Sequence, residues 1–254
     1  FLRNLSHELR TPLNVILGWT QILDEDATAE EVQEGISIIN QSGRRQELVI
    51  KDLLECSKIV AGQIDLHAST FNISDLISPV LDSLDLSIQA KKLDIRVYAE
   101  PSAALVNADP ERCREVLWHL ISNAIKFSGM KGVINIRSYR DESYCALEIS
   151  DQGIGISEDF LPKVFDLFTR EETGVTKSYS GTGLGLSIGR YYAEAQGGNL
   201  LVESAGKTMG TTVTLKLPVA AIRFVPKKNA DPLYMSHVFQ HLLERGDRLS
   251  AEEA

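Results

Sequence analysis

The stretch Ser6-His7-Glu8-Leu9-Arg10-Thr11-Pro12 brings a histidine, a carboxylate, an arginine and a hydroxyl together within about one and a half helical turns. With Leu2 and Leu9 at heptad position a, His7 falls at position f, the farthest from the apolar seam. The residues that form this seam alternate between spacings of three and four, which predicts an amphipathic helix: Leu2, Leu5, Leu9, Pro12, Ile16, Trp19 and Leu23.

The helix face of His7 is polar and basic. Its members lie within two turns of the histidine on the same side: Arg3, Arg10, Thr11 and Asn14. A phosphoryl group on that face would meet two guanidinium groups and two polar side chains, which suits a dianion. Neutral imidazole is a competent nucleophile, and Glu8 can accept a hydrogen bond from one ring nitrogen, leaving the other free to attack. Pro12 is expected to kink or loosen the helix just past this site.

A second helical run follows the first and predicts a hairpin. It extends from Val32 to Val60, although its seam contains Gly43, Gln46 and Ser57. The polar stretch 24–30 predicts the turn, and Ala61-Gly62 ends the second helix. Two helices with single apolar stripes cannot bury those stripes alone, whereas two hairpins paired into a four-helix bundle can. We therefore expect a homodimer.

Beyond residue 66 the sequence pattern changes to that of alternating strands and helices, which indicates an α/β sandwich. Strands are expected at 93–98, 133–139, 144–150, 199–203 and 211–217, and helices at 74–90, 110–126 and 182–196. The sequence thus predicts a helical hairpin over residues 1–66 and an α/β domain over 67–220. A linker and a short amphipathic helix, with Met235, Val238, Phe239 and Leu242, are expected within 221–254.

Two glycine clusters in the α/β domain suggest a phosphate-binding site. Asp151-Gln152-Gly153-Ile154-Gly155 follows an expected strand, and Gly181-Thr182-Gly183-Leu184-Gly185 opens an expected helix. Backbone amides at a helix N-terminus that side chains leave uncovered can cradle phosphate oxygens. Asn123 and Lys126 lie one turn apart on another helix, where an amide oxygen suits Mg²⁺ and an ammonium suits phosphate.

Composition narrows the possible partners and compartment. The net charge of −9 offers no basic block for a nucleic acid, so none is expected as a partner. Three dispersed cysteines without CxxC spacing fit a reducing compartment, which points to the cytoplasm. No apolar run is long enough to cross a bilayer. Because the chain opens inside its first motif, we expect a fragment that contacts a membrane only through upstream sequence.

The first fourteen residues resemble the H-box of the sensor histidine kinases at every signature position. The resemblance implies that His7 is autophosphorylated by ATP, with Glu8 as its general base. It also implies that Thr11 orients water when the same bundle dephosphorylates a response regulator. The phosphoryl group of His7 would otherwise pass to an aspartate of that regulator.

The distant motifs resemble the N, G1 and G2 boxes of the GHKL ATP-binding fold, in the family's order and spacing. The resemblance implies that Asp151 binds the adenine amino group and Asn123 binds Mg²⁺. Phe165 and Phe168 match the F-box. Residues 170–180 would form the ATP lid. The resemblance implies a nucleotide site that contains Asn123, Lys126, Asp151, Gly153, Gly155, Phe168, Arg170, Lys177, Gly181, Thr182, Gly183, Leu184 and Gly185.

One position departs from the family pattern. His119 stands where a second asparagine is common, four residues before Asn123. Its imidazole can replace the missing amide at the phosphate–metal cluster, or it can simply pack or face solvent. Two other functions compete with the kinase: a GHKL-type ATPase without a phosphohistidine, and a dimeric scaffold or phosphatase-dominant protein.

Overall fold

A computed structural model of the chain describes residues 2–23, 27–100, 105–171 and 182–220, with side chains from residue 6 onward. One compact unit contains Phe1–Gln63 and Gly174–Leu184, and the other contains Ile64–Thr173 and Gly185–Asp231. The expected C-terminal extension, Lys177 and Gly181 lie outside the described residues. Within those residues, no helix is long and apolar enough to span a bilayer.

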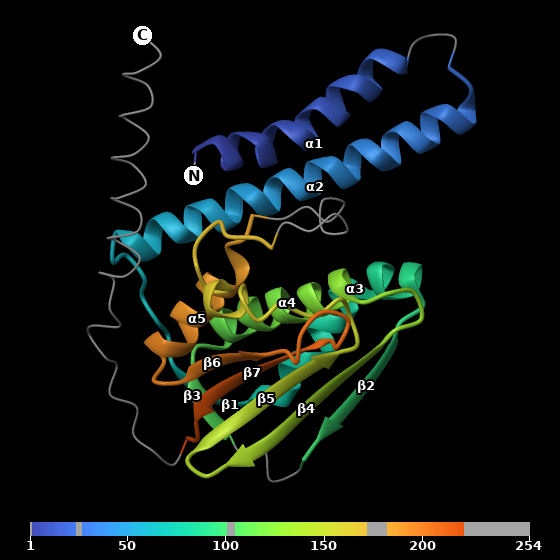
Figure 1. Cartoon of the computed structure of the whole chain (residues 1–254). Coiled ribbons are helices and arrows are strands. Elements are labelled where there is room, and N and C mark those ends of the chain that lie inside the picture. The colour runs from blue at the N-terminus through green and yellow to red at the C-terminus, as the bar shows by residue number, and fades with distance from the viewer. Residues whose placement is uncertain (1, 24–26, 101–104, 172–181, 221–254) are drawn as a thin grey trace. The chain divides into compact units, whose positions relative to one another are not determined.

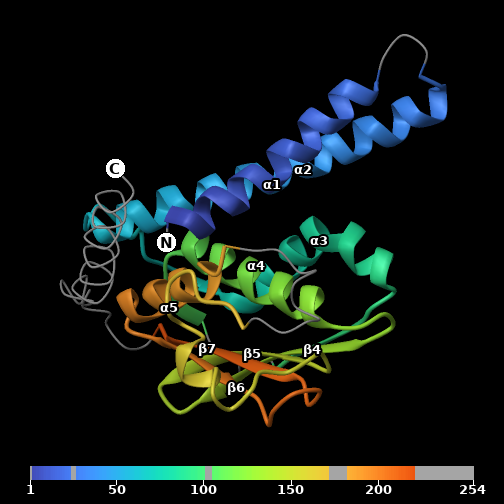
Figure 2. The same ribbon diagram turned by 45° about the horizontal axis from the view of Figure 1, so that its top comes forward.

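The first unit is a helical hairpin whose two helices run side by side in opposite directions (Figures 1 and 2). They are α1 (Leu2–Ile22), which continues through Pro12, and α2 (Ala29–Val60). A capping box starts α2, because the Glu31 N–H donates to Thr28 Oγ1 at 3.3 Å and the Thr28 N–H donates to Glu31 Oε2 at 2.9 Å. The helix ends where predicted, with Gly62 at φ +64 and its N–H bonded to the Ile59 carbonyl.

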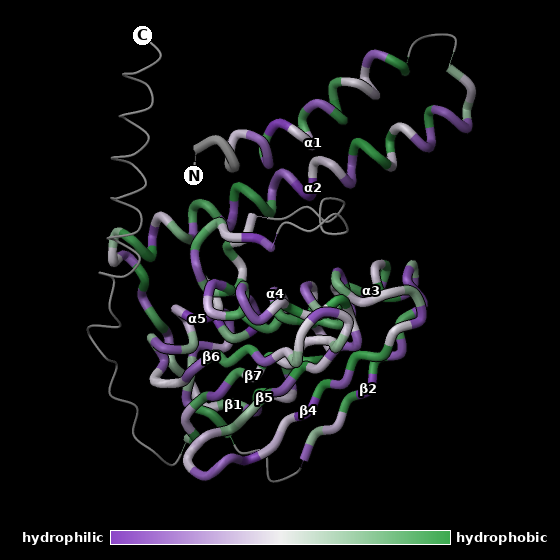
Figure 3. The backbone as a smooth tube through the Cα atoms, viewed as in Figure 1, coloured by the Kyte–Doolittle hydropathy of each residue, from purple (hydrophilic) through white to green (hydrophobic). Residues whose placement is uncertain are grey.

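The buried stripe of α2 lies one residue earlier than the predicted seam. Gly35, Ser42, Val49 and Cys56 are buried at intervals of seven. On the predicted seam, by contrast, Ile36 and Ile50 keep 46% and 44% of their surface exposed. Small residues allow α1 to approach, since a Cβ on Gly35 would lie 2.8 Å from the Trp19 ring. Figure 3 shows apolar residues recurring along both helices, so the periodicity by itself did not decide which stripe faces inward.

The second unit is built on a five-stranded sheet of order β2-β4-β5-β7-β6. Its strands are β2 (Asp94–Ala99), β4 (Val133–Asp141), β5 (Tyr144–Asp151), β6 (Asn199–Glu203) and β7 (Thr211–Pro218). The β2–β4 pair is parallel and the other pairs are antiparallel. All five strands coincide with the runs that the sequence predicts. The fold class is confirmed as a helical hairpin followed by an α/β domain.

Three helices cover one face of this sheet (Figures 1 and 2). They are α3 (Ile77–Lys91), α4 (Pro110–Phe127) and α5 (Gly185–Ala195), with short 3-10 helices η1 (Ile73–Leu76) and η2 (Leu161–Lys163) beside them in the sequence. A small antiparallel pair, β1 (Ser69–Asn72) with β3 (Leu105–Ala108), was not predicted. The alternating Cys145, Leu147 and Ile149 of β5 are at most 1% exposed, as a strand facing the core requires.

Candidate functional site

The predicted acceptor His7 lies on the exposed side of α1, together with Arg10 and Asn14. Thr11 is half-buried, and its Oγ1 donates a hydrogen bond to the His7 carbonyl at 2.9 Å. That bond ties the hydroxyl to the helix turn that carries the histidine. The side chain of Arg3 is outside the described part of the chain.

Glu8 has a neighbour that the sequence did not predict. Its side chain is only 12% exposed, and its Oε2 atom lies 3.6 Å from Nη2 of Arg45 on α2. Arg45 is itself partly exposed, so the pair lies at the edge of the hairpin interior. Helical spacing relates residues within one helix and gives no signal for a pairing between two helices. The arginine thus places a positive charge 3.6 Å from one oxygen of the carboxylate that is expected to act as base.

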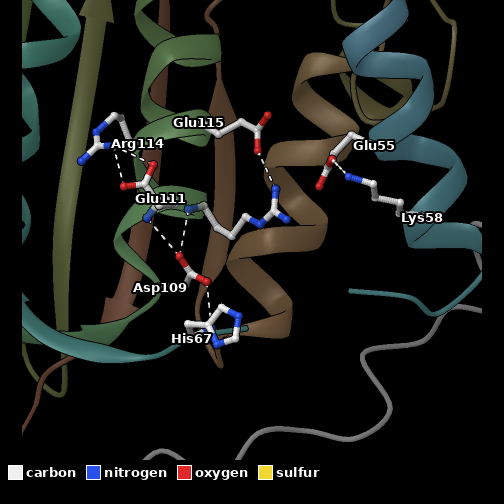
Figure 4. Close-up of polar contacts among 8 residues, drawn as sticks. Glu55, Lys58, His67, Asp109, Glu111, Arg114 and Glu115 are labelled. Atoms are coloured by element: carbon white, nitrogen blue, oxygen red, sulfur yellow. Dashed lines mark hydrogen bonds and ion pairs between the residues drawn. The ribbon is translucent and has the colours of Figure 1, made fainter. Parts of the chain in front are cut away.

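Helix α4, which carries the predicted N box, begins at a buried carboxylate (Figure 4). Asp109 is 4% exposed, and its Oδ1 accepts hydrogen bonds from the N–H groups of Glu111 and Arg112. Its Oδ2 accepts from the backbone N–H of His67 at 2.8 Å, while its own N–H donates to Gln196 Oε1. The cap therefore ties the start of α4 to the chain that enters this unit and to the residue after α5.

The first glycine cluster lies directly after β5, against the other end of α4. The Gly153 N–H donates to Asp151 Oδ1 at 2.8 Å, and the Ile154 N–H donates to the Phe127 carbonyl at 3.3 Å. A Cβ on Gly153 would lie 2.5 Å from that same carbonyl oxygen. Gly155 has φ +64, and a Cβ there would collide with the Gly206 carbonyl. Only glycine allows this close backbone approach.

The surroundings of Asp151 shift the pKa of its carboxyl group. Burial raises its pKa above the ordinary value, while hydrogen bonds from the backbone of Gly153 and Thr211 act in the opposite direction. A partly buried acceptor at the end of a strand is suited to pair with a donor on a flat heterocycle. This is the role that the family resemblance implies for Asp151.

The second glycine cluster leads into α5 later than predicted. The helix begins at Gly185 and not at Thr182, because Gly183 has φ +70 and cannot belong to a right-handed helix. The Leu184 N–H donates to Thr182 Oγ1 at 3.2 Å, and Leu184 is fully buried. Gly183 lies two residues before the start of α5, and the N-terminus of a helix is a favourable place for an anion.

His119 packs against the start of α5. It is 8% exposed, and a Cβ on Gly185 would lie 2.8 Å from its Nδ1 atom. On α4, His119, Asn123 and Phe127 follow each other at intervals of four and therefore share one face. One end of this face contacts Gly185 at the start of α5, and the other end holds the first glycine cluster. Asn123, which is half-buried, occupies the middle position between them.

The remaining predicted residues have the following surroundings. Lys126 is half-buried, with its Nζ 4.7 Å from the centroid of the Phe127 ring. Phe168 has φ +60, and Arg170 follows it, both half-buried. The other F-box residue, Phe165, lies under the guanidinium of Arg190 at 4.9 Å.

Comparisons with known proteins agree with both motifs. Residues 1–62 match the family model of the His Kinase A (phospho-acceptor) domain, and residues 108–221 match that of the histidine kinase-, DNA gyrase B-, and HSP90-like ATPase. The chain belongs to the histidine kinase family. It is 32% identical over 254 residues to the circadian input-output histidine kinase CikA of Synechococcus elongatus, an alignment that covers 97% of this chain and 33% of CikA. This chain therefore spans about a third of that relative.

Solved structures of histidine kinases share the fold. The histidine kinase ThkA in complex with response regulator protein TrrA matches with a TM-score of 0.66 and 26% identity, over 85% of this chain and 60% of that chain. Full-length ShkA in complex with AMPPNP matches with a TM-score of 0.64 and 25% identity, over 89% of this chain and 46% of that chain.

Proposed function

We propose that this chain is the catalytic core of an ATP-dependent protein histidine kinase that transfers the γ-phosphoryl group of ATP to His7. The observation that carries the proposal is the single face of α4 on which Asn123 lies between Gly185, at the start of α5, and the first glycine loop. An amide side chain beside a helix N-terminus is suited to a triphosphate. The exposed His7, in a separate unit, supplies the acceptor nitrogen.

Within the nucleotide site, Asp151 accepts a hydrogen bond from the adenine amino group. The phosphates lie along the backbone of the second cluster, residues 181–185, while Gly153 and Gly155 keep the first loop close to α4. Phe168, Arg170 and Lys177 belong to the segment beside the phosphates. The glycines fit this role, because a Cβ at Gly153, Gly155 or Gly185 would meet neighbouring atoms at once.

Asn123 provides the side-chain oxygen for Mg²⁺, and Lys126 provides an ammonium within a turn of it. The bound ion supplies charge neutralisation on the phosphates. Asn123 has both features that this role requires: a neutral amide oxygen and a half-buried place between the two glycine clusters.

In the transfer, a ring nitrogen of His7 forms a bond to the γ-phosphorus, and the bond from that phosphorus to the bridging oxygen of ADP breaks. The proton on the other ring nitrogen passes to Glu8, whose carboxylate Arg45 holds from α2. The guanidinium of Arg10, one turn from His7, offsets the charge of the phosphorylated ring.

Two hairpins form a four-helix bundle in this proposal, so the functional species is a homodimer. An aspartate of a response regulator receives the phosphoryl group from His7, and the ThkA–TrrA complex supports a partner of this kind. Thr11 orients water when the regulator is dephosphorylated. Its hydroxyl oxygen keeps acceptor capacity while donating to the His7 carbonyl.

The proposed domains span residues 1–66 and 67–220. We place this part of the protein in the cytoplasm. The cysteines support this location, since Cys56, Cys113 and Cys145 are buried free thiols.

Incubation of the chain with γ-labelled ATP and Mg²⁺ tests the proposal. We expect label on the protein that is stable to base and lost in acid, as for a phosphorus–nitrogen bond. Release of inorganic phosphate without protein label would instead indicate a GHKL-type ATPase. If neither activity appears, the result would indicate a dimeric scaffold or a phosphatase-dominant protein and not a kinase.

A further inference from the structure

Lys91, the last residue of α3, contacts the C-terminal end of α4. Its Nζ donates hydrogen bonds to the carbonyls of Ile125, Lys126 and Ser128 at 2.9, 2.7 and 2.9 Å. Its own carbonyl accepts from the Lys131 N–H at 2.8 Å, so its backbone is held to the same turn. No sequence motif singled out this lysine.

These contacts complete the end of the helix that carries the nucleotide site. The last carbonyls of a helix lack partners within the helix, and a cation near them also interacts favourably with the helix dipole. Here Lys91 takes two of these carbonyls, those of Ile125 and Lys126, together with that of the C-cap residue Ser128, and the Ile154 N–H of the first glycine cluster takes the carbonyl of Phe127. The lysine and the glycine loop are therefore attached to neighbouring peptide groups at the end of α4.

The same turn determines where the site residues lie. Asn123 and Lys126 belong to the last turns of α4, and Gly153 packs its backbone against the Phe127 carbonyl. Rotation or fraying of this turn would move the amide of Asn123 and the loop after Asp151 together. Partial burial lowers the pKa of Lys91, so the ammonium is kept here in spite of a desolvation cost.

We propose that Lys91 is a positioning residue of the nucleotide site: its ammonium fixes the last turn of α4 and so sets Asn123 and the first glycine loop in register with each other. The inference rests on the proposed nucleotide-binding function of this unit. Lys91, a residue of α3, thereby determines the geometry on which Mg²⁺-dependent nucleotide binding depends.

The experiment compares Lys91→Met with Lys92→Met in the full chain. Lys92 is the adjacent residue, its side chain is exposed, and the substitution removes the same charge at a residue that already has φ +53. Calorimetric titration with AMPPNP, with Mg²⁺ and again with EDTA, gives the affinity of each protein. Thermal unfolding without nucleotide fixes a temperature at which every variant is folded.

For Lys91→Met we expect binding of Mg²⁺–AMPPNP to weaken about tenfold, with a smaller loss in EDTA, because supports of metal-site residues have effects of this size. Lys92→Met should bind as the wild type does. Lys91→Arg should restore part of the affinity. Should Lys91→Met fail to fold, the affinities of Lys91→Arg and Lys92→Arg are compared instead. Lys91→Arg should then bind more weakly, since a planar guanidinium cannot direct its donors to three carbonyls as an ammonium does.

Equal affinities in Lys91→Met and wild type, equal losses in both lysine variants, or an equal loss with and without Mg²⁺ would overturn the positioning role. Absence of nucleotide binding by the wild type would instead overturn the proposed function itself. The two failures are therefore distinguishable.

Discussion

Apolar side chains are arranged differently in the two units. Among the described residues of the hairpin, large apolar side chains keep more than a third of their surface exposed in one copy of the chain: Leu13, Val15, Leu17, Ile22, Ile36, Leu48, Ile50 and Leu54. In the α/β unit, strand residues such as Ile134, Ile136 and Leu217 are fully buried. One copy of the hairpin thus leaves much of its apolar surface exposed, as the proposed dimer requires, whereas the α/β unit has a buried core of its own.

The largest expected effect tests whether the two sites are separate. His7→Gln should abolish protein labelling by ATP, because no ring nitrogen remains to accept the phosphoryl group, while AMPPNP affinity should stay at the wild-type value. Labelling and calorimetry measure the two properties. His67→Gln is the matched control, since His67 contributes its backbone N–H to Asp109. A parallel loss of nucleotide affinity in His7→Gln would contradict the separation.

The contrast in packing predicts where a charge disrupts assembly. Ile50→Glu should convert the dimer to monomer, because it places a carboxylate on the exposed apolar stripe of α2. Leu86→Glu, at a residue of α3 that is 79% exposed, should leave the dimer intact. Sedimentation velocity over a range of protein concentrations distinguishes them. Dissociation by the α3 substitution as well would mean that the α/β unit contributes to the dimer.

A smaller effect is expected where function and stability oppose each other. Asp151→Asn keeps an oxygen for the Gly153 N–H but presents an amide donor to the adenine amino group, so nucleotide affinity should fall about 10- to 100-fold.

The unliganded protein should respond in the other direction. Burial raises the pKa of Asp151 in the folded state, so the ionised carboxylate opposes folding, and stability is gained as pH falls through the raised pKa. Asp151→Asn should remove this contribution and leave the unliganded protein at least as stable at neutral pH. Denaturant titrations at neutral and acidic pH check it, and a clear destabilisation at neutral pH would refute it.

The smallest effect concerns the contact between the N box and the start of α5. Gly185→Ala should destabilise the α/β unit by about 1–3 kcal/mol, since the new Cβ meets the buried ring of His119. In His119→Ala the ring is absent, and the added cost of Gly185→Ala should largely disappear. A double-mutant cycle measured by denaturant unfolding gives the coupling. Additive costs would show that the two residues do not compete for the same space.

Local patterns predicted much of this molecule. The alternation through Cys145, Leu147 and Ile149 identified β5, and Ala61-Gly62 marked the end of α2, where Gly62 is left-handed. The short strands β1 and β3 were missed, because four residues give too few alternations to register. The stripe of α2 that faces α1 within one chain was not predicted, because Gly35 and Ser42 carry no apolar signal.

The sequence by itself determined the kinds of elements, their order and the motifs that identify the family, because hydrophobic period, caps and glycines act over a few residues. Only the tertiary structure decided that Arg45 meets Glu8, that His119 faces Gly185 and that Lys91 closes the end of α4. Each of these pairs joins different elements. Their contact depends on how helices and loops pack in three dimensions, which spacing along one chain segment does not encode.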